Sequence, residues 1–233
     1  MKRIAIAGGL LTSAALLTSG LTGCGLTSAA GPAEQDKASY EVTEKVTRLE
    51  VRNGSGDTLI TETGGGSVKV DETLHWRGNR PETEHTVDGD TLLITYRCPP
   101  RPGSCSVNYK IQIPEGLEVK AEAGSGDITL RSLSGPLTVS SGSGSLDGSG
   151  LTGKTVLAEA GSGDIELEYE TAPERAEAEA GSGDVTLRVP DGSYDVAAEA
   201  GSGDTTVSVR ADRNAPHKIK VSAGSGDVSV LPK

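Results

Sequence analysis

The chain has 233 residues, a formal net charge of −11, 32 glycines, no phenylalanine and only 3% aromatic residues. So few large side chains exclude a thick globular core, but they suit a narrow core of Ala, Val, Ile and Leu built in many thin layers. The acidic charge excludes nucleic acid and an anionic bilayer surface as partners, because both would be repelled. Cations and basic surfaces are left as partners.

The N-terminal residues predict export. Two basic residues precede an apolar run at 4–17, which is too short for a comfortable membrane span but typical of a signal peptide. Residues 21–24 read Leu-Thr-Gly-Cys, which resembles the lipobox of a bacterial lipoprotein. We therefore expect a signal peptide at 1–23, a lipid anchor on Cys24 and a location on the outer side of the bacterial cell membrane. The alternative is an ordinary cleaved signal with an incidental cysteine.

Residues 24–40 contain mainly Ala, Gly, Ser, Pro and charged side chains without apolar periodicity, and we expect a flexible tether there. If Cys24 is lipidated, Cys98 and Cys105 remain as a pair on either side of a Pro-rich loop. An oxidising exterior favours a disulfide between them. The alternative is two free or metal-binding thiols.

From Glu41 onward, apolar and polar residues alternate with a period of two, which predicts strands with one buried face. No sustained apolar helical period occurs in this part of the sequence. We expect an irregular N-terminal β part at 41–118 and a regular β-repeat part of the same domain at 119–233.

The regular part is marked by the sequence Gly-Ser-Gly-Asp. It occurs at 54–57, 124–127, 161–164, 181–184, 201–204 and 224–227, and a degenerate Gly-Ser-Gly-Ser copy lies at 142–145. From residue 124 the copies are 18, 19, 20, 20 and 23 residues apart, a spacing typical of stacked repeats. Aliphatic residues keep the same parity on both sides of each copy, so we expect equivalent positions to stack on each other.

These observations predict an all-β fold, a right-handed β-solenoid or β-roll of about 20-residue coils with Gly-Ser-Gly-Asp corners. The alternative is an antiparallel β-sandwich or meander in which Gly-Ser-Gly-Asp is a hairpin turn, and alternation alone does not exclude it. The near-identity of successive copies favours coils, because stacking equivalent residues rewards repetition.

Three sequence features are shared with a known family. They are the alternating Tyr-Lys-Ile-Gln-Ile-Pro-Glu-Gly entry at 109–116, the repeated Ser-Gly-Asp followed by aliphatic, polar and aliphatic residues, and Leu-Ser-Gly-Pro-Leu-Thr-Val at 133–139. On these features, residues 41–231 resemble the bacterial putative-adhesin β-strand-repeat family, formerly a domain of unknown function. The resemblance implies a β-solenoid at the cell surface and supplies no catalytic residues. The chain departs from the family pattern in its Cys98–Cys105 loop and in Ser145, which replaces an Asp.

The acidic residues at the corners suggest calcium as an alternative ligand. If the coils stack, one row contains Asp127, Asp164, Asp184, Asp204 and Asp227, and a second contains Glu122, Glu159, Glu179 and Glu199. However, one Asp per corner is a thin ligand set for an ion that takes about six to eight oxygens. The favoured interpretation is that each Asp accepts hydrogen bonds from the N–H groups of its own turn. If calcium is structural, chelation lowers the melting temperature sharply.

The sequence contains no recognisable catalytic constellation, because His75, His85 and His217 lack metal-ligand spacing and no Gly-x-Ser-x-Gly motif occurs. We expect no catalytic residue, no cofactor and no small-molecule substrate. The expected function is a non-enzymatic, lipid-anchored surface domain that binds a protein or an envelope polymer, with specific contacts near Trp76 and the cysteine loop. A calcium-binding β-roll and an accessory ectodomain in envelope stress sensing are the alternatives.

Overall fold

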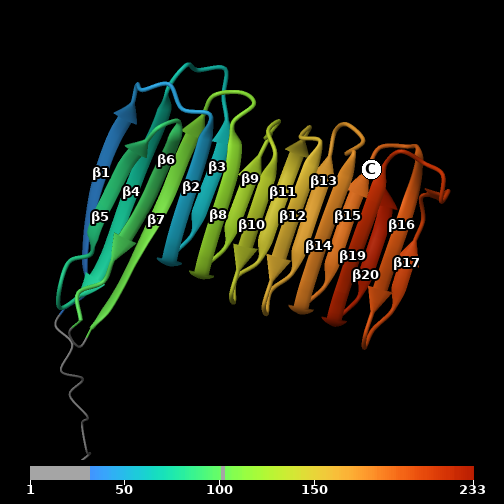
Figure 1. The fold of residues 1–233 in the computed structure, drawn as a ribbon. Coiled ribbons are helices and arrows are strands. Elements are labelled where there is room, and N and C mark those ends of the chain that lie inside the picture. Colours follow the sequence, from blue (N-terminus) through green and yellow to red (C-terminus); the bar gives the residue numbers. More distant parts are fainter. Residues whose placement is uncertain (1–31, 101–102) are drawn as a thin grey trace, which may run out of the picture.

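The computed structural model describes residues 32–100 and 103–233, and in these ranges it has twenty strands and no helix. The strands form two ten-stranded sheets in an elongated stack (Figure 1). Sheet I has the order β1 (Glu34–Val42), β4 (Val68–Arg77), β7 (Ser104–Ile113), β3 (Thr58–Glu62), β9 (Ile128–Arg131), β11 (Leu146–Leu151), β13 (Ile165–Tyr169), β15 (Val185–Val189), β20 (Val228–Pro232), β17 (Thr205–Val207). Sheet II has the order β18 (Arg210–Ala211), β16 (Ser193–Ala200), β19 (Lys218–Ser225), β14 (Arg175–Ser182), β12 (Thr155–Ala160), β10 (Leu137–Ser141), β8 (Glu118–Ser125), β2 (Arg48–Ser55), β6 (Thr91–Arg97), β5 (Glu82–Asp88). No helix that could span a membrane is found in the two described ranges.

Equivalent strands of successive coils pair in parallel. In sheet II, β10 lies between β8 and β12 with parallel register on both sides, and in sheet I, β11 lies between β9 and β13 in the same way. Each Gly-Ser-Gly-Asp corner joins a strand of sheet II to a strand of sheet I. The predicted β-solenoid is therefore confirmed, and the antiparallel meander is wrong because the corner never folds a strand back onto its own sheet neighbour.

The core is a thin layer between the sheets. Sheet I contributes mainly Ile, Leu and Val, such as Ile128, Ile165 and Leu187, whereas sheet II contributes many alanines, such as Ala158 and Ala178. All five of these side chains are buried. Small residues on one sheet allow the larger aliphatic side chains of the other to fill the space, which explains how the chain forms a continuous core without phenylalanine.

The corners stack through their glycines. A Cβ added to the first glycine of a corner would lie 2.4 to 2.6 Å from the carbonyl oxygen of the first glycine in the adjacent coil, as at Gly142, Gly161 and Gly181. A Cβ added to the second glycine would lie 1.9 to 2.4 Å from the corresponding carbonyl oxygen, as at Gly144 and Gly183. Both glycines are therefore required by the contact between coils.

The coils do not follow chain order at the C-terminal end of the stack. From β8 to β15, paired residues of neighbouring coils are 18 to 20 residues apart, as for Leu146 and Ile165. Val185, however, pairs with Val228, because β19 and β20 lie between the β14–β15 coil and the β16–β17 coil. Residues 190–217 thus form an end coil, and the last coil of the chain is inserted beneath it.

The N-terminal part continues the same stack. Strands β2 and β3 pair in parallel with β8 and β9, although we expected an irregular region at 41–118. Beyond them, β6 and β7 add a further coil, and the antiparallel strands β1, β4 and β5 close this end. The expected tether at 24–40 was too long, because residues 34–40 belong to β1.

The glycine contacts lead to a stability prediction. Replacing Gly183 by Ala is expected to lower the free energy of unfolding by about 2 to 4 kcal/mol, because φ at this residue is +134° and its Cβ would meet the Gly163 carbonyl oxygen at 2.4 Å. Urea unfolding followed by circular dichroism measures the loss. Gly66→Ala is the matched control, since a Cβ at Gly66 has no heavy atom within 4 Å. Equal stabilities for the two variants would contradict the glycine contact.

Candidate functional site

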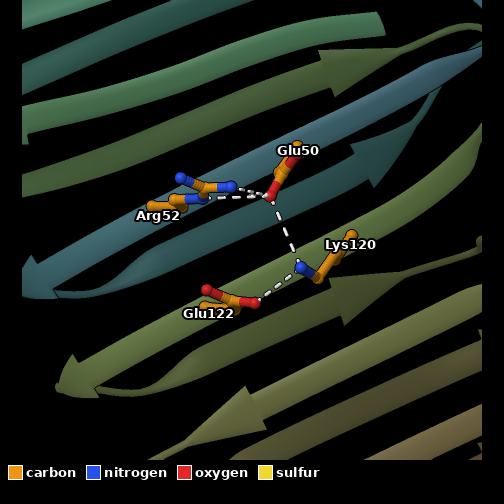
Figure 2. A network of polar contacts seen from close by, with 4 residues as sticks. All are labelled: Glu50, Arg52, Lys120 and Glu122. Carbon is orange, nitrogen blue, oxygen red and sulfur yellow. Dashed lines mark hydrogen bonds and ion pairs between the residues drawn. The ribbon is translucent and has the colours of Figure 1, made fainter.

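Alternate residues of sheet II point outward and form rows along the stack, because parallel pairing places equivalent positions side by side. Such rows meet on β2 and β8, where Glu50 lies opposite Lys120 and Arg52 lies opposite Glu122 in the strand register (Figure 2). Arg52 donates to Glu50 at 2.7 Å, Lys120 lies 3.4 Å from Glu50, and Lys120 lies 2.8 Å from Glu122. Two positive and two negative charges therefore cancel within one connected network.

Glu50 is the centre of this network. Its side chain is only 17% exposed, whereas the side chains of Arg52 and Lys120 are 54% and 39% exposed. The hydrogen bond from Arg52 holds the pKa of Glu50 below its ordinary value, and the bond to Glu122 raises the pKa of Lys120. The sequence did not reveal this network, because its two strands are 70 residues apart and register alone brings them together.

The predicted row of glutamates is interrupted. Ser140 lies between Glu122 and Glu159, and Ser222 lies between Glu179 and Glu199. Only Glu159 and Glu179 pair directly. Most neighbouring glutamates of this row are thus separated by a neutral hydroxyl side chain, which reduces the repulsion that a continuous row would create.

The corner aspartates form a row, and their order along it is that of the coils in the stack, which differs from their order in the sequence. Along the corners its members are Asn108, Asp57, Asp127, Ser145, Asp164, Asp184, Asp227 and Asp204. Asp227 precedes Asp204 because the last coil of the chain is inserted beneath the end coil. The sequence predicted five of these members, Asp127, Asp164, Asp184, Asp204 and Asp227, but missed Asp57 and Asn108 and did not predict the order.

The carboxylates of this row, except that of the last member Asp204, accept a backbone hydrogen bond from the next coil. The Asp184 N–H donates to Oδ1 of Asp164, the Asp227 N–H to Oδ1 of Asp184, and the Asp204 N–H to Oδ1 of Asp227, each at 2.8 Å. The same bond joins Ser145 to Asp127 at 2.9 Å. We expected each Asp to accept from its own turn, and this was wrong: the bonds run between coils, because stacking points the N–H groups along the stack.

These bonds bear on the calcium hypothesis. One oxygen of these carboxylates already accepts a backbone hydrogen bond. Among residues 32–100 and 103–233, no three side chains of His, Cys, Asp or Glu lie close enough together to hold a metal ion. Calcium binding at Asp127, Asp164, Asp184, Asp204 and Asp227 stays a prediction, and the residues present offer an ion one carboxylate per coil.

The N-terminal end of the stack carries the chemistry that departs from the repeat. Tyr40 of β1 stacks on His85 of β5, with ring centroids 4.0 Å apart, so the two aromatic rings join the outermost strands of sheets I and II. The Arg80 guanidinium lies 5.9 Å from the Trp76 ring centroid, and Arg80 also pairs with Asp36 of β1 at 2.8 Å. Trp76 is half-buried against the core.

The structure contains a disulfide between Cys98 and Cys105, with Cα atoms 5.9 Å apart. Cys105 is the register partner of Trp76 on the adjacent strand, and Glu34 at the start of β1 is the partner of Trp76 on the other side. The bridge, the tryptophan and the entry of the chain into the domain therefore lie together. Cys24 lies outside the described residues.

A buried acid lies just inside this end. Glu72 is 3% exposed and lies on the inward face of β4, between the buried residues Val70 and Leu74. It pairs in register with Tyr109. Burial, and next the charge of Glu72, raises the pKa of the Tyr40 and Tyr109 hydroxyls. We did not predict a buried acid at Glu72 from the sequence.

The comparisons with known proteins agree with this architecture. A family model described as Toastrack DUF4097 matches residues 44–231, which is most of the chain. The chain belongs to the Toastrack DUF4097 family. The resemblance to the putative-adhesin β-strand-repeat family is thereby confirmed, and the matched range covers both the irregular and the regular part of the Toastrack domain.

Solved structures similar to this Toastrack domain share little sequence with it. A "putative cell adhesion protein" from Clostridium sporogenes is 14% identical, with a TM-score of 0.52 over 87% of this chain and 100% of that chain. A "putative adhesin" from Bacteroides fragilis is 12% identical, with a TM-score of 0.35 over 86% of this chain and 97% of that chain. At this identity, the first likeness shows the fold alone. No curated protein is similar enough in sequence to be matched.

The Glu50 network leads to a pH-dependent prediction. Glu50→Gln is expected to lower the free energy of unfolding by about 0.5 to 1 kcal/mol at neutral pH, because two cations lose a partly buried carboxylate. The pKa of Glu50 lies below its ordinary value of 4.5, so the stabilisation is present above that pH and is lost as the pH falls through the folded pKa. Urea unfolding at neutral pH and at about pH 3 measures both effects. Glu115→Gln, on an exposed turn, is the control and should change neither.

Proposed function

We propose that this chain is a non-enzymatic domain, held on the outer side of the bacterial cell membrane by a lipid on Cys24, that binds a protein or an envelope polymer through the N-terminal end of its stack. The observation that carries the proposal is the grouping of Trp76, Arg80 and the Cys98–Cys105 bridge at this end. Trp, Arg and Tyr are the residues that most often dominate the binding energy of interfaces.

The remaining surface supports this choice of site. On sheet II, Arg52, Glu50, Lys120 and Glu122 satisfy one another, and Arg175 pairs with Glu177 in the same way. Such internally paired charges gain little from a partner, because a new contact would have to replace an existing one. The end formed by β1, β4 and β5 offers instead a half-buried aromatic ring, Trp76, beside a disulfide, with the Asp36-paired Arg80 lying over the ring.

The location of the anchor supports a partner close to the membrane. Glu34, the first residue of β1, is ten positions after Cys24. Fully extended, this segment reaches at most about 35 Å. A lipid on Cys24 would therefore keep the Trp76 end near the membrane, and β16 and β17 lie at the other end of the stack (Figure 1). The adhesion name of the Clostridium sporogenes structure is consistent with a binding role.

The binding site is tested by substitution at Trp76. Trp76→Ala and Arg80→Ala are each expected to weaken binding of the domain to isolated cell envelopes by about tenfold, because each removes one member of the fixed pair. Trp76 is the only tryptophan of the chain, so its fluorescence should change when envelopes are added to the unsubstituted domain.

The matched control is Leu157→Ala, which removes an exposed apolar side chain from β12 in the middle of sheet II. It should leave binding unchanged. Thermal melts of all three variants separate lost binding from lost folding. If Leu157→Ala weakens binding while Trp76→Ala and Arg80→Ala do not, the partner contacts the face of sheet II and the proposed site is wrong.

The anchor is tested separately. Cys24→Ala is expected to move the protein from the membrane fraction to the soluble fraction, because the thiol that would carry the lipid is removed. Fractionation followed by immunoblotting measures the shift. Unchanged membrane association of the variant would refute the lipid anchor without affecting the proposed binding site.

A further inference from the structure

The end coil, residues 190–217, is packed much less tightly than the coils inside the stack. Three of its inward side chains, Val196, Ala198 and Ala200, are only partly buried, although Tyr194 at the start of β16 is fully buried. The equivalent side chains of β14, Ala176, Ala178 and Ala180, are at most 4% exposed. All three residues of β17 are exposed, and Val207 reaches 40%. This loss of burial follows from position, because the end coil has a neighbour on one side only.

The coil beneath it is complete without the end coil. The parallel pairs β14–β19 and β15–β20 join the last coil of the chain directly to the preceding one. With the end coil in place, its inward residues, Ile219, Val221, Ala223, Val228 and Val230, are at most 4% exposed. In a stack of repeats, stability is approximately a sum of terms between nearest neighbours. Loss of the end coil therefore costs one interface and leaves the rest of the stack paired.

The strands β15 and β19 could also be connected directly, without the end coil. Five residues, 132–136, connect β9 to β10, and five residues, 170–174, connect β13 to β14. Between β15 and β19 lie residues 190–217. Removing 193–215 would leave five residues for the same connection, so this segment has the position of an extra coil inserted into an otherwise regular one.

We propose that residues 193–215 are a cap, and that the edge of β19 and β20 beneath them is a surface on which a second copy of this chain can dock. The cap itself shows what fits there. β16 pairs with β19 over six residues and β17 with β20 over three, and the Asp204 N–H donates to Oδ1 of Asp227. The edge is thus already paired in parallel with another coil of the same chain, over six residues of β19 and three of β20.

Two uncapped copies have a self-complementary way to meet. A two-fold axis perpendicular to the sheets would place β19 against β19 of the second copy and β20 against its β20, each antiparallel, so that both sheets continue through the junction. A pairing centred on Val221 sets Lys220 opposite Ser222 rather than opposite another lysine. The buried side chains of both edges would stay covered. The cap therefore keeps an apolar double edge from pairing with another molecule.

Hydrogen exchange on the intact chain tests whether the cap opens by itself. Amides of Val196–Ala200 and Thr205–Val207 are expected to exchange at least about tenfold faster than the matched amides of Ala176–Ala180 and Val185–Leu187. Amides of β19 and β20 that pair with β14 and β15 should exchange at the slower rate. Equal rates in the end coil and in β14 and β15 would overturn the proposal, because the end coil would then open only with the whole stack.

Deletion tests the edge itself. A variant lacking residues 193–215 is expected to fold and to show about twice the molar mass of one variant chain in light scattering, at concentrations where the full chain has a lower number of copies per particle. The matched control lacks residues 155–174, which are one interior coil, and keeps the cap. Joining Lys154 to Arg175 puts β14 in the place of β12 with the same register. It should keep the assembly state of the full chain.

The outcomes separate clearly. A folded deletion variant with the assembly state of the full chain would overturn the docking surface. A deletion variant that fails to fold, while the interior deletion folds, would overturn the claim that the segment is a dispensable cap. A doubled mass for both variants would assign the association to the loss of a coil in general and would equally refute the role of the cap.

Discussion

Neighbouring coils of this protein can approach each other only because the first and third residues of their corners lack a side chain. Wherever one Gly-Ser-Gly-Asp corner stacks on another, a Cβ would meet the carbonyl oxygen of the adjacent corner at 2.6 Å or less. This single contact sets the spacing of the coils at the corner, and the parallel hydrogen bonds of both sheets depend on that spacing. The parallel pairing in both sheets therefore depends on these glycines.

The polar residues of the corner follow from the same stacking. Once the coils are superimposed, the N–H of one corner points toward the Asp of the neighbouring corner, and the carboxylate accepts it at 2.8 Å at three successive steps. Ser145 takes part as a donor to Asp127, yet its own side chain is shorter than an Asp. One degenerate copy is tolerated because the glycines, which carry the steric requirement, are retained at Gly142 and Gly144.

The two ends of the stack differ in structure, and we assign them different roles. At the N-terminal end, antiparallel strands and the Cys98–Cys105 bridge close the sheets beside the Tyr40–His85 stack, whereas residues 119–233 contain neither an antiparallel strand pair nor a cysteine. At the other end, the sheets finish with a loosely packed coil of the repeat itself. The N-terminal end, whose features do not repeat, suits a specific partner, whereas the C-terminal end, which is a coil of the repeat, suits a second copy of this chain.

The sequence by itself determined the all-β fold, the coil period, the parity of each strand and five members of the aspartate row, because glycine positions and alternation are local properties of the chain. The pairing of Cys98 with Cys105 also followed from their number and spacing. Only the tertiary structure decided the order of the coils, since a long connection costs little more than a short one and allows β19 and β20 to lie beneath β16 and β17. It also decided the Glu50 network and the direction of the aspartate bonds, because these contacts join residues through register between strands far apart in the chain.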